Sequence, residues 1–590
     1  MISFSGPVTT PGSEERSADS SGERAPAAGP FTDSTVPHRR AALAVWGAII
    51  VAGFGVGAIL RSTGHLPVDR FPPLHADPRL LIGPLLPAVV VGLVAVAVLP
   101  IAARRLPWRS VLLTAWLGSA LWAVALQLPD GLARPLTAPT EYLAGLPAIG
   151  DDPLRWLRGF AGAMQAYPTH VKGHPPLPTL ILWALQRAGL RDAGWAAALV
   201  ITAGSSAVAA IAITVRRLAG ADAARRAVPF VVLAPTALWV ATSMDALFLG
   251  VAAWAVALVT IAATRPAPDG FEPVATAHDE PASVHSPPVH SPPALSAPGD
   301  AALRGLPPLR STPGDRGPGT RGGAALGCAF AGGLLLGSLP YLSYGLLPMF
   351  ALPLAVLVLT RPPRAVLGAL AAGCVVVPAA FTLAGFSWFE GVAGTHTAWA
   401  AGGGARARPY AYFLVGDVSV LALLIGPATA MALPTVLRHT AALAKALLPG
   451  GPADPGENRW RGTGRGALRW RGAGHSMLRW RGAERAEYRP AGAGHSAFRW
   501  RGAGGERVAA EGPGGSVWIG RLGWPVAAAL AGMIALDLSG VTRGEVERIW
   551  IPYAAWTTIA PAVVRPPART LLLAQVATAL VIQALARSPW

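Results

Sequence analysis

The strongest constraint on this chain is a succession of apolar segments, each close to the length that a membrane-spanning helix requires. About 20 predominantly apolar residues cross the hydrocarbon core of a bilayer as an α-helix. Backbone polar groups find no water there, so helices that satisfy their own hydrogen bonds are favoured. We therefore predict an all-α, polytopic membrane protein with about 13 transmembrane helices, at residues 41–61, 80–103, 110–128, 193–215, 227–243, 244–264, 323–340, 342–360, 364–385, 411–433, 521–539, 550–564 and 569–587.

Composition supports this assignment. The chain has 590 residues, of which 52% are hydrophobic and only 14% are charged. Its mean hydropathy of +0.44 is too high for a soluble domain of this size. Cys328 and Cys374 both lie in apolar runs, so we expect packing thiols rather than a disulfide framework or a cysteine metal site. The residues indicate no cofactor and no metal site, and they leave a divalent-metal requirement open.

The distribution of arginine predicts how the helices are oriented. Cytosolic loops of membrane proteins carry an excess of Lys and Arg. With the N-terminus in the cytosol, every predicted cytosolic connection is Arg-rich, as at 104–109, 215–226 and 360–364. This holds only if 176–190, which begins with a proline cluster, lies at the interface instead of crossing. Residues 129–192 then form the first large outer loop, with interfacial helices inside it.

Low-complexity stretches divide the chain into a disordered cytosolic tail, three parts of one membrane domain and two cytosolic inserts. In chain order these are the tail 1–40, membrane part 41–264, Pro-rich insert 265–322, membrane part 323–440, RWRG-repeat insert 441–519 and membrane part 520–590. The basic, Trp-bearing repeats either touch anionic lipid headgroups or are an expansion without a role. The net charge of +18 comes mainly from short loops and the inserts, so we expect no nucleic-acid partner.

The predicted outer segments collect most of the ionisable groups outside the tail and inserts. Such groups are expensive near a bilayer, so they are read as functional unless they are merely solvated loop charges. The set comprises Glu141, Asp151, Asp152, His170, Lys172, His174, Asp245, Glu390, His396, Arg406, Arg408, Glu545, Glu547 and Arg548. Because these residues come from loops far apart in the sequence, the topology predicts that they converge on one side of the membrane.

This set contains the groups that a sugar transfer needs. A carboxylate must accept the proton of the acceptor hydroxyl, and cationic or His groups must hold the departing phosphate. We take Glu141 as the candidate base, because it opens an apolar helix start where its pKa can be tuned. The alternative for Glu141 is a helix-start carboxylate stabilised by the local dipole. Candidate phosphate partners are His170, Lys172, His174 and Arg548.

Other members of the set have two interpretations each. His174 either binds donor phosphate or hydrogen-bonds a loop carbonyl, and Asp245 either contacts substrate or forms a turn. Glu545 and Arg548 are also spaced to pair on a helix as a structural clasp. The neighbouring aromatic residues form either a membrane-interface belt or stacking surfaces for sugars, and they are Trp388, Phe389, Trp399, Tyr410 and Tyr412.

Three motifs occur in a fixed order on this outer side. They are TEYL at 140–143, GHPPL at the entry to a short helix at 173–177, and TSMDALF at 242–248. In this order and topology they resemble the GT-C superfamily of glycosyltransferases that use polyprenyl-phosphate sugars, which includes the protein O-mannosyltransferases and the aminoarabinose lipid A transferase. Segments of uncharacterised actinobacterial members of that group are similar to 386–391, 408–413 and 544–550. The resemblance runs from about 41 to 587, without the inserts.

The resemblance implies an inverting transfer of a sugar, with mannose expected, from a polyprenyl-phosphate carrier to a hydroxyl of a cell-envelope acceptor. The family often carries paired acids where this chain has Thr140 and Glu141, so either Glu141 alone serves as the base or Asp151 or Asp152 contributes. The catalytic candidates are therefore Glu141 and Asp152. The substrate-binding residues that it implies are Tyr142, His170, Lys172, His174, Asp245, Arg408, Tyr410, Glu545, Glu547 and Arg548.

A multi-spanning transporter or lipid flippase of the cell envelope is the alternative function. Transporters usually show internal repeats and polar groups at mid-bilayer. Here the predicted spans hold few charges, with Asp417 and Asp537 near span ends, and the two halves of the chain do not repeat. The sequence therefore favours a glycosyltransferase of the cell membrane, with the N-terminus and both inserts in the cytosol.

Overall fold

The computed structural model describes residues 36–67, 69–264, 318–402, 408–447, 513–564 and 568–589. Most of the predicted tail, most of both inserts and Arg406 lie outside the described residues, whereas 36–40 of the predicted tail begin a helix.

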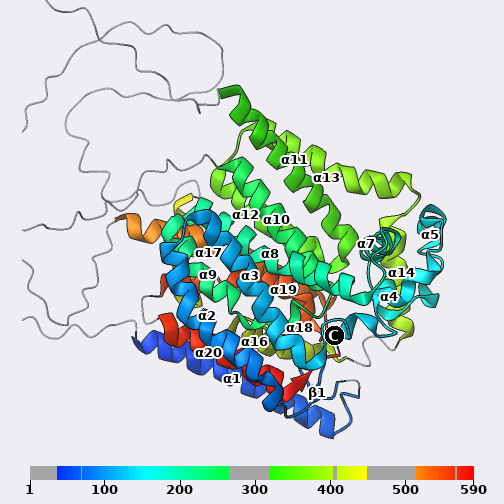
Figure 1. Cartoon of the computed structure of the whole chain (residues 1–590), viewed down its shortest axis with the longest axis horizontal. Coiled ribbons are helices and arrows are strands. Elements are labelled where there is room, and N and C mark those ends of the chain that lie inside the picture. Colours follow the sequence, from blue (N-terminus) through cyan, green and yellow to red (C-terminus); the bar gives the residue numbers. More distant parts are fainter. Residues whose placement is uncertain are drawn as a thin grey trace, which may run out of the picture.

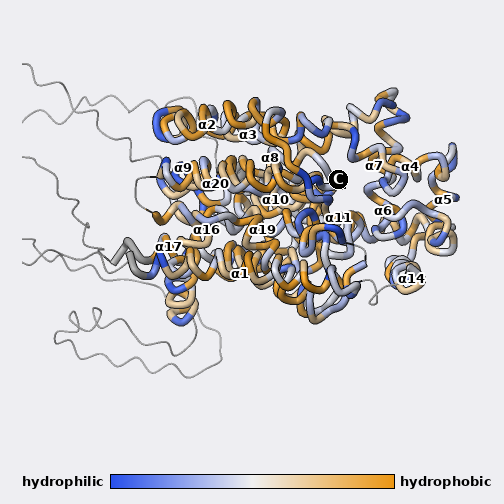
Figure 2. Tube along the Cα trace, turned by 90° about the horizontal axis from the view of Figure 1, so that it is seen from below, coloured by the Kyte–Doolittle hydropathy of each residue, from blue (hydrophilic) through white to orange (hydrophobic). Residues whose placement is uncertain are grey.

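Long apolar helices dominate the described part of the chain, where ten of them are long and apolar enough to cross a membrane. They are α1 (Val36–Ser62), α2 (Leu86–Arg105), α3 (Trp108–Gln127), α8 (Ala193–Ala219), α10 (Asp245–Ala263), α11 (Pro318–Leu342), α13 (Arg364–Leu383), α16 (Tyr410–Leu447), α17 (Pro513–Ser539) and α20 (Ala568–Leu585). Their middle parts are hydrophobic, and hydrophilic residues gather at the two ends of the bundle (Figure 2). The prediction of an all-α, multi-pass membrane protein is confirmed.

Three further predicted spans, at 227–243, 342–360 and 550–564, are broken helices in the structure. Each combines a short α-helix with a 3₁₀ turn, as α9 (Ala221–Val232) with η6 (Pro235–Trp239), η7 (Tyr344–Phe350) with α12 (Ala351–Thr360), and α19 (Ile551–Thr557) with η9 (Ala560–Val563). Proline interrupts each segment, because it lacks the N–H that continues a helix. Non-helical backbone is tolerated at membrane depth where protein covers it, and every residue of η6 and α19 is buried.

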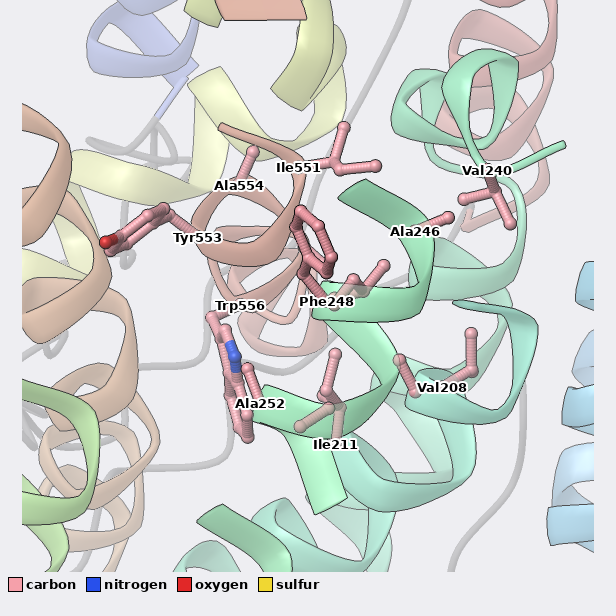
Figure 3. Close-up of a cluster of buried hydrophobic side chains, with 14 of the residues drawn as sticks. Val208, Ile211, Val240, Ala246, Phe248, Ala252, Ile551, Tyr553, Ala554 and Trp556 are labelled. Carbon is pink, nitrogen blue, oxygen red and sulfur yellow. The ribbon is translucent and has the colours of Figure 1, made fainter. Parts of the chain in front are cut away.

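The centre of the bundle is the contact between α8, α10 and α19 (Figure 3). Phe248 of α10 and Trp556 of α19 are fully buried there, with Ile211 of α8 beside them. Inside a bilayer such side chains stabilise the bundle through close van der Waals packing, because lipid is as apolar as the core. The broken helix α19 is therefore held at the core by large side chains rather than by its own hydrogen-bond ladder.

Helices α11 and α13 form a close parallel pair at one edge of the bundle (Figure 1), with Tyr341 and Phe381 stacked near their C-terminal ends. A Cβ added to Gly373 would lie 2.1 Å from the carbonyl oxygen of Phe330, and one added to Gly337 would lie 2.3 Å from that of Cys374. Only glycine permits the two backbones to come so close. The predicted packing cysteines, Cys328 and Cys374, are half-buried free thiols on these two helices.

Helix α16 is kinked at Gly426, whose φ of 68° interrupts the helical backbone just before Pro427. The side chain of Gln575, on α20, satisfies the groups that the kink leaves unpaired. Its Nε2 donates to the carbonyl of Ile425 at 3.0 Å, and its Oε1 accepts from the N–H of Ala428 at 3.3 Å. Polar groups opened by a break in a buried helix thus find partners on a neighbouring helix.

Short elements crowd one end of the bundle, at the right of Figure 1. The large loop at 129–192 holds α4 (Tyr142–Gly145), α5 (Pro153–Gly159), α6 (Thr169–Lys172) and α7 (Leu177–Arg187). As predicted, the segment after the proline cluster is a helix too short to span, since α7 has 11 residues. Helices α14 (Trp388–Ala401) and α18 (Val546–Ile549) lie at the same end, and the short 3₁₀ turns of this region are η1 (Gly83–Leu85), η2 (Leu128–Asp130), η3 (Pro135–Thr137), η4 (Leu146–Ala148) and η5 (Met164–Ala166).

A two-stranded clamp, β1 (Asp77–Pro78) with β2 (Ala586–Arg587), joins the segment between α1 and α2 to the segment after α20. Strand β1 pairs antiparallel with β2, which follows α20. Next to β1, Arg79 donates to both carboxylate oxygens of Asp130, at 2.6 and 2.8 Å. Such bidentate pairs combine charge with fixed geometry. The segment between α1 and α2 is therefore anchored to the end of α20 and to the end of α3.

The glycine contact between α11 and α13 predicts a large difference between two positions of one helix. Gly373→Val must push the backbone of α11 away, which we expect to cost about 1–3 kcal/mol or more. Gly368→Val is the control, because a Cβ at Gly368 meets nothing within 4 Å. Thermal unfolding in detergent should show a lower Tm for the first variant alone. Equal Tm values for the two variants would contradict the close packing.

Candidate functional site

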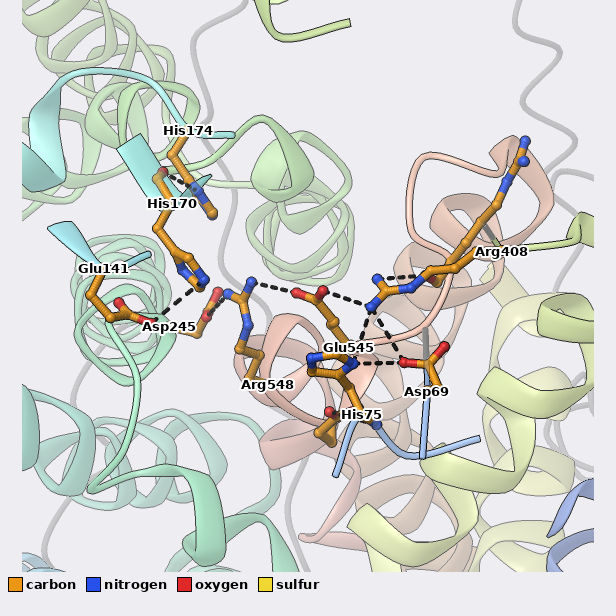
Figure 4. A network of polar contacts seen from close by, with 11 residues as sticks. Asp69, His75, Glu141, His170, His174, Asp245, Arg408, Glu545 and Arg548 are labelled. Atoms are coloured by element: carbon orange, nitrogen blue, oxygen red, sulfur yellow. Dashed lines mark hydrogen bonds and ion pairs between the residues drawn. The ribbon is translucent and has the colours of Figure 1, made fainter. Parts of the chain in front are cut away.

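The polar residues at the crowded end of the bundle form one continuous network (Figure 4). Its members come from the ends of helices and from the loops between them, on segments hundreds of residues apart. At its centre is Arg548 of α18, which donates to Asp245 Oδ2 through Nη1 at 2.7 Å and to Glu545 Oε2 through Nη2 at 2.8 Å. Arg548 and Asp245 are both nearly inaccessible to solvent, so each requires the other's charge.

Local structure explains how these three side chains are placed. Asp245 is the first residue of α10, directly after the buried segment that contains η6. Glu545 precedes α18 with a left-handed φ of 57°, which is strained for a residue with a side chain, and Gly544 before it has a φ of 71°. The N–H of Gly544 donates to Asp417 of α16 at 3.2 Å. The buried carboxylate of Asp417 therefore holds the turn that presents Glu545 and Arg548.

A second arginine extends the network toward the loop after α1. Arg408 Nη2 lies 2.8 Å from Glu545 Oε1 and 3.4 Å from Asp69 Oδ1. The same Oδ1 atom of Asp69 lies 2.6 Å from Nδ1 of the His75 imidazole. The backbone N–H of His75 donates to Glu547 at 3.3 Å. Five acidic, basic and His residues from three separate segments are thus joined beside Arg548.

Glu141 lies in a pocket of aromatic and His rings on the other side of Arg548. Its Oε1 is 3.5 Å from Nε2 of His170, and both side chains are buried. The ring centroids of His170 and His174 lie 5.9 and 5.5 Å from that of Tyr142. Glu141 occupies the position before α4, yet its side chain forms no capping hydrogen bond there. His174 Nδ1 lies 2.9 Å from the carbonyl of His170, which is the loop-carbonyl alternative considered from the sequence.

Burial and neighbouring charges give these groups unusual acidities. Burial raises the pKa of Glu141 to about 7, against the opposing charge of Arg548. Burial also lowers the pKa of His174 to about 4 and that of His170 well below its ordinary value. Neutral imidazoles therefore surround a carboxyl group that exchanges its proton near neutrality. Such a carboxyl group is suited to act as a general base.

The arginine side of the network has the opposite character. Burial alone would raise the pKa of Glu545, but Arg548 and Arg408 hold it well below its ordinary range. Burial alone would lower the pKa of His75, because it disfavours the charged imidazole. The hydrogen bond to Asp69 and the charge of Glu545 outweigh this effect, so the pKa of His75 is raised. Burial raises the pKa of Glu547 more than the charges of His75 and Arg408 lower it, so its pKa is about 7. This half of the site is a set of ion pairs, whereas the Glu141 half is close to neutral.

A small polar cavity lies beside the ion pairs. His75, Glu547, Thr242 and Gln583 line it, and its volume of about 20 Å³ has room for roughly one water molecule. One carboxylate oxygen of Glu547 is buried without a hydrogen-bond partner in the described part of the chain. Among the described residues, no group of three or more His, Cys, Asp or Glu side chains is arranged to hold a metal ion.

The structure brings together most of the residues that the sequence singled out. Nine of them belong to the network or to the adjoining pocket, namely Glu141, Tyr142, His170, His174, Asp245, Arg408, Glu545, Glu547 and Arg548.

The structure places the others apart. Asp152 is an exposed N-cap that accepts from the N–H of Arg155 at 2.9 Å, so its role is to begin α5. Asp151 forms an exposed ion pair with Arg187 at 2.7 Å. Tyr410 donates to the carbonyl of Leu538, and the carbonyl of Lys172 accepts from Thr395. None of these contacts joins the network in the described part of the chain.

Sequence reasoning missed two members, Asp69 and His75, which lie in the short outer segment 62–79. Their partner Arg408 is more than 300 positions away in the chain. The available signal was an acid and a His around a proline pair in a segment of the predicted outer side. This signal is weaker than that of the large loop 129–192, which holds more ionisable residues.

Comparison with known proteins identifies no relative, since no family model, no curated protein and no solved structure matches this chain. Evidence on function therefore comes from the geometry of the network and from its residues.

The central ion pair predicts a strong dependence of folding on Asp245. Asp245→Ala removes one partner of a buried pair and leaves Arg548 undercompensated, which we expect to cost about 3–5 kcal/mol. Asp151→Ala is the matched control, because the pair of Asp151 with Arg187 is exposed and contributes at most about 1 kcal/mol. The two free energies of unfolding can be compared by denaturant titration in detergent. A similar small loss for both variants would show that the Arg548 pair is not a structural requirement.

Proposed function

We propose that this protein is a membrane glycosyltransferase of the GT-C type. In this proposal it transfers a sugar, with mannose expected, from a polyprenyl-phosphate carrier to a hydroxyl of a cell-envelope acceptor. One observation carries the proposal. A buried carboxyl group with a pKa of about 7, Glu141, lies at the same end of a membrane bundle as two arginines, Arg408 and Arg548. A proton acceptor and an anion-binding group are the two requirements of the reaction.

The proposed reaction is a single displacement at the anomeric carbon. The acceptor oxygen attacks that carbon as its hydroxyl proton passes to Glu141, and the bond from the carbon to the phosphate oxygen breaks. The electron pair of that bond leaves with the lipid phosphate, whose growing negative charge is stabilised by Arg548 and Arg408. Attack from the face opposite the phosphate inverts the configuration of the sugar. Tyr142, His170 and His174 exclude bulk water from the carboxyl group and help to keep it basic.

The position of the network suits a substrate that is held in the bilayer. Its residues lie at the ends of membrane helices, and exposed apolar side chains such as Phe389 and Leu383 lie at the same end. A phosphate at the lipid headgroup level reaches such a site while its hydrocarbon chain stays among the lipids. A water-soluble nucleotide sugar has no need of this location.

We infer further that the three broken segments also cross the membrane, which gives thirteen crossings. The start of α9 lies at one end of the bundle, because Arg225 donates to the carbonyl of Leu106 in the connection between α2 and α3 at 2.9 Å. The next helix, α10, starts in the network at the other end with Asp245. The segment between them must therefore pass from end to end. The connections near 344–360 and 551–563 run between opposite ends in the same way.

The end of the bundle away from the network is rich in arginine, which supports the assignment of that end to the cytosol. Arg104, Arg105, Arg216 and Arg217 lie in the last turns of α2 and α8, and Arg225 follows in α9. By the positive-inside rule this end is cytosolic and the network faces the outer side of the cell membrane. The same assignment places the N-terminus and both inserts in the cytosol.

A transporter or flippase remains the competing proposal. A buried carboxylate inside a span is typical of such proteins, and Asp417 in α16 meets that description. Its carboxylate accepts the N–H of Gly544, however, and so supports the turn that carries Glu545. The contact assigns Asp417 to the framework of the network rather than to a path across the bilayer.

The first test replaces the proposed base. Glu141→Gln keeps the size of the side chain but removes its proton affinity, and we expect sugar transfer to fall by about 10²–10⁴-fold. Transfer of label from radiolabelled polyprenyl-phosphate mannose to membrane acceptors should be measured in vesicles at equal expression. Asp152→Asn is the control and should retain wild-type transfer.

Two results would change the proposal. Transfer that survives Glu141→Gln would keep the enzyme class and move the base elsewhere. No transfer by the wild type with several lipid-linked sugars, in vesicles that contain folded protein, would favour the transporter.

The acidity of Glu141 predicts how the rate depends on pH. A base must be ionised, and because burial raises the pKa of Glu141 to about 7, the active fraction grows as the pH rises through neutrality. We expect kcat/KM to fall about tenfold for each pH unit below about 6. The charges that face Glu141 are those of Arg548, Asp245 and Glu545, with His170 and His174 neutral in this range. A rate that is constant between pH 5 and 8 would exclude Glu141 as the base.

A further inference from the structure

Glu545 occupies an unusual place between the two arginines of the network. One carboxylate oxygen pairs with Arg408 and the other with Arg548, each at 2.8 Å (Figure 4). A carboxylate that shares its two oxygens between two guanidinium groups has the same contacts that two oxygens of a phosphate group would make.

Glu545 is also the partner that the arginines can lose. Without it, Arg548 keeps its pair with Asp245, and Arg408 keeps its pair with Asp69. Glu545 is the acid that the two arginines share, and its departure still leaves each arginine with a carboxylate partner of its own.

The network opens to solvent on the side of Glu545. The exposed fractions of the side chains are larger there than at the centre, with 25% for His75, 22% for Glu545 and 19% for Arg408, against 6% for Arg548, 4% for Asp245 and 1% for Asp69. A group that enters from outside meets Glu545 before it meets the buried arginine.

The turn that carries Glu545 holds this residue in a strained backbone conformation. Glu545 itself has a strained φ of 57°, and Gly540 and Gly544 before it have φ values of 63° and 71°. Strain of this kind persists only where contacts enforce it. The two ion pairs of Glu545 are such contacts, so their replacement releases the residue.

We propose that Glu545 holds the place of a phosphate group in the ligand-free protein, and that a phosphate ligand displaces it from Arg408 and Arg548. This inference deepens the proposed function, because the phosphate of the lipid carrier is the expected ligand. Binding therefore includes the cost of breaking two ion pairs of Glu545. The carboxylate of Glu545 thus competes with the ligand for both arginines. Only an anion that pairs with Arg408 and Arg548 together replaces it.

The experiment measures binding of the sugar-free carrier, so it does not depend on sugar transfer. Purified protein in nanodiscs is titrated with radiolabelled polyprenyl phosphate, for the wild type, Glu545→Gln and Glu545→Gly. The Gly variant relieves the left-handed backbone and protects against a failure to fold. Glu390→Gln is the matched control, because Glu390 is an exposed acid of α14 at the same end of the bundle.

We expect both Glu545 variants to bind polyprenyl phosphate about tenfold more tightly than the wild type, and Glu390→Gln to bind as the wild type does. Inorganic phosphate, added as a competitor, should displace the carrier more readily from the Glu545 variants if the site recognises phosphate alone. Competition that stays equally weak in all proteins assigns the recognition to the lipid-borne group.

Weaker or unchanged binding in folded Glu545 variants would overturn the inference and make Glu545 a fixed clasp. An equal gain in Glu390→Gln would also overturn it, because a general loss of negative charge would then explain the effect. Tighter binding by the Glu545 variants in a protein that transfers no sugar would leave this inference standing and refute only the proposed function.

Discussion

Arg548 is buried at the end of a membrane bundle, and the need to pair its charge governs the structure around it. A guanidinium group cannot be discharged by burial, so carboxylates must be brought to it from elsewhere. Asp245 is supplied by the start of α10 and Glu545 by a strained turn before α18, at 2.7 and 2.8 Å. Because α10 and α19 pack at the centre of the bundle, the ion pair also fixes the ends of the two helices that form the core. The chemistry of the site and the packing of the fold are therefore coupled.

The same end of the bundle separates two kinds of environment within a short distance. Arg408, Arg548 and their carboxylates form a charged half, while Glu141 lies among aromatic and neutral imidazole rings. The first environment favours ionised groups and the second disfavours them. Pairs of titratable groups whose surroundings push their pKa values apart are a common way to build an acid-base site. The charged half and the Glu141 half together supply the anion-binding group and the base of the proposed transfer.

Hydropathy predicted the long helices because bilayer crossing imposes one length and one polarity on each segment. It could not predict that 227–243, 342–360 and 550–564 are broken, since a buried break keeps the same apolar composition; only the prolines signalled it. Topology and residue type predicted Glu141, Asp245 and Arg548, whereas Asp152 proved to be a helix cap, because a cap and a catalytic acid use the same side chain. Asp69 and His75 were missed because their contacts with Arg408 join distant segments, which no local pattern records.

The clamp between β1 and β2 bears on the order in which the protein is made. Strand β1 lies between the first two membrane helices, and its partner follows α20, so the pairing of Asp77 with Arg587 waits for the last helix to be inserted. The network has the same dependence, because Asp69 and Asp245 are synthesised long before Arg548. During synthesis the early helices must therefore keep these acids in contact with water at the membrane surface. The ion pair at the centre of the site therefore forms only after the segment that carries Arg548 has been made.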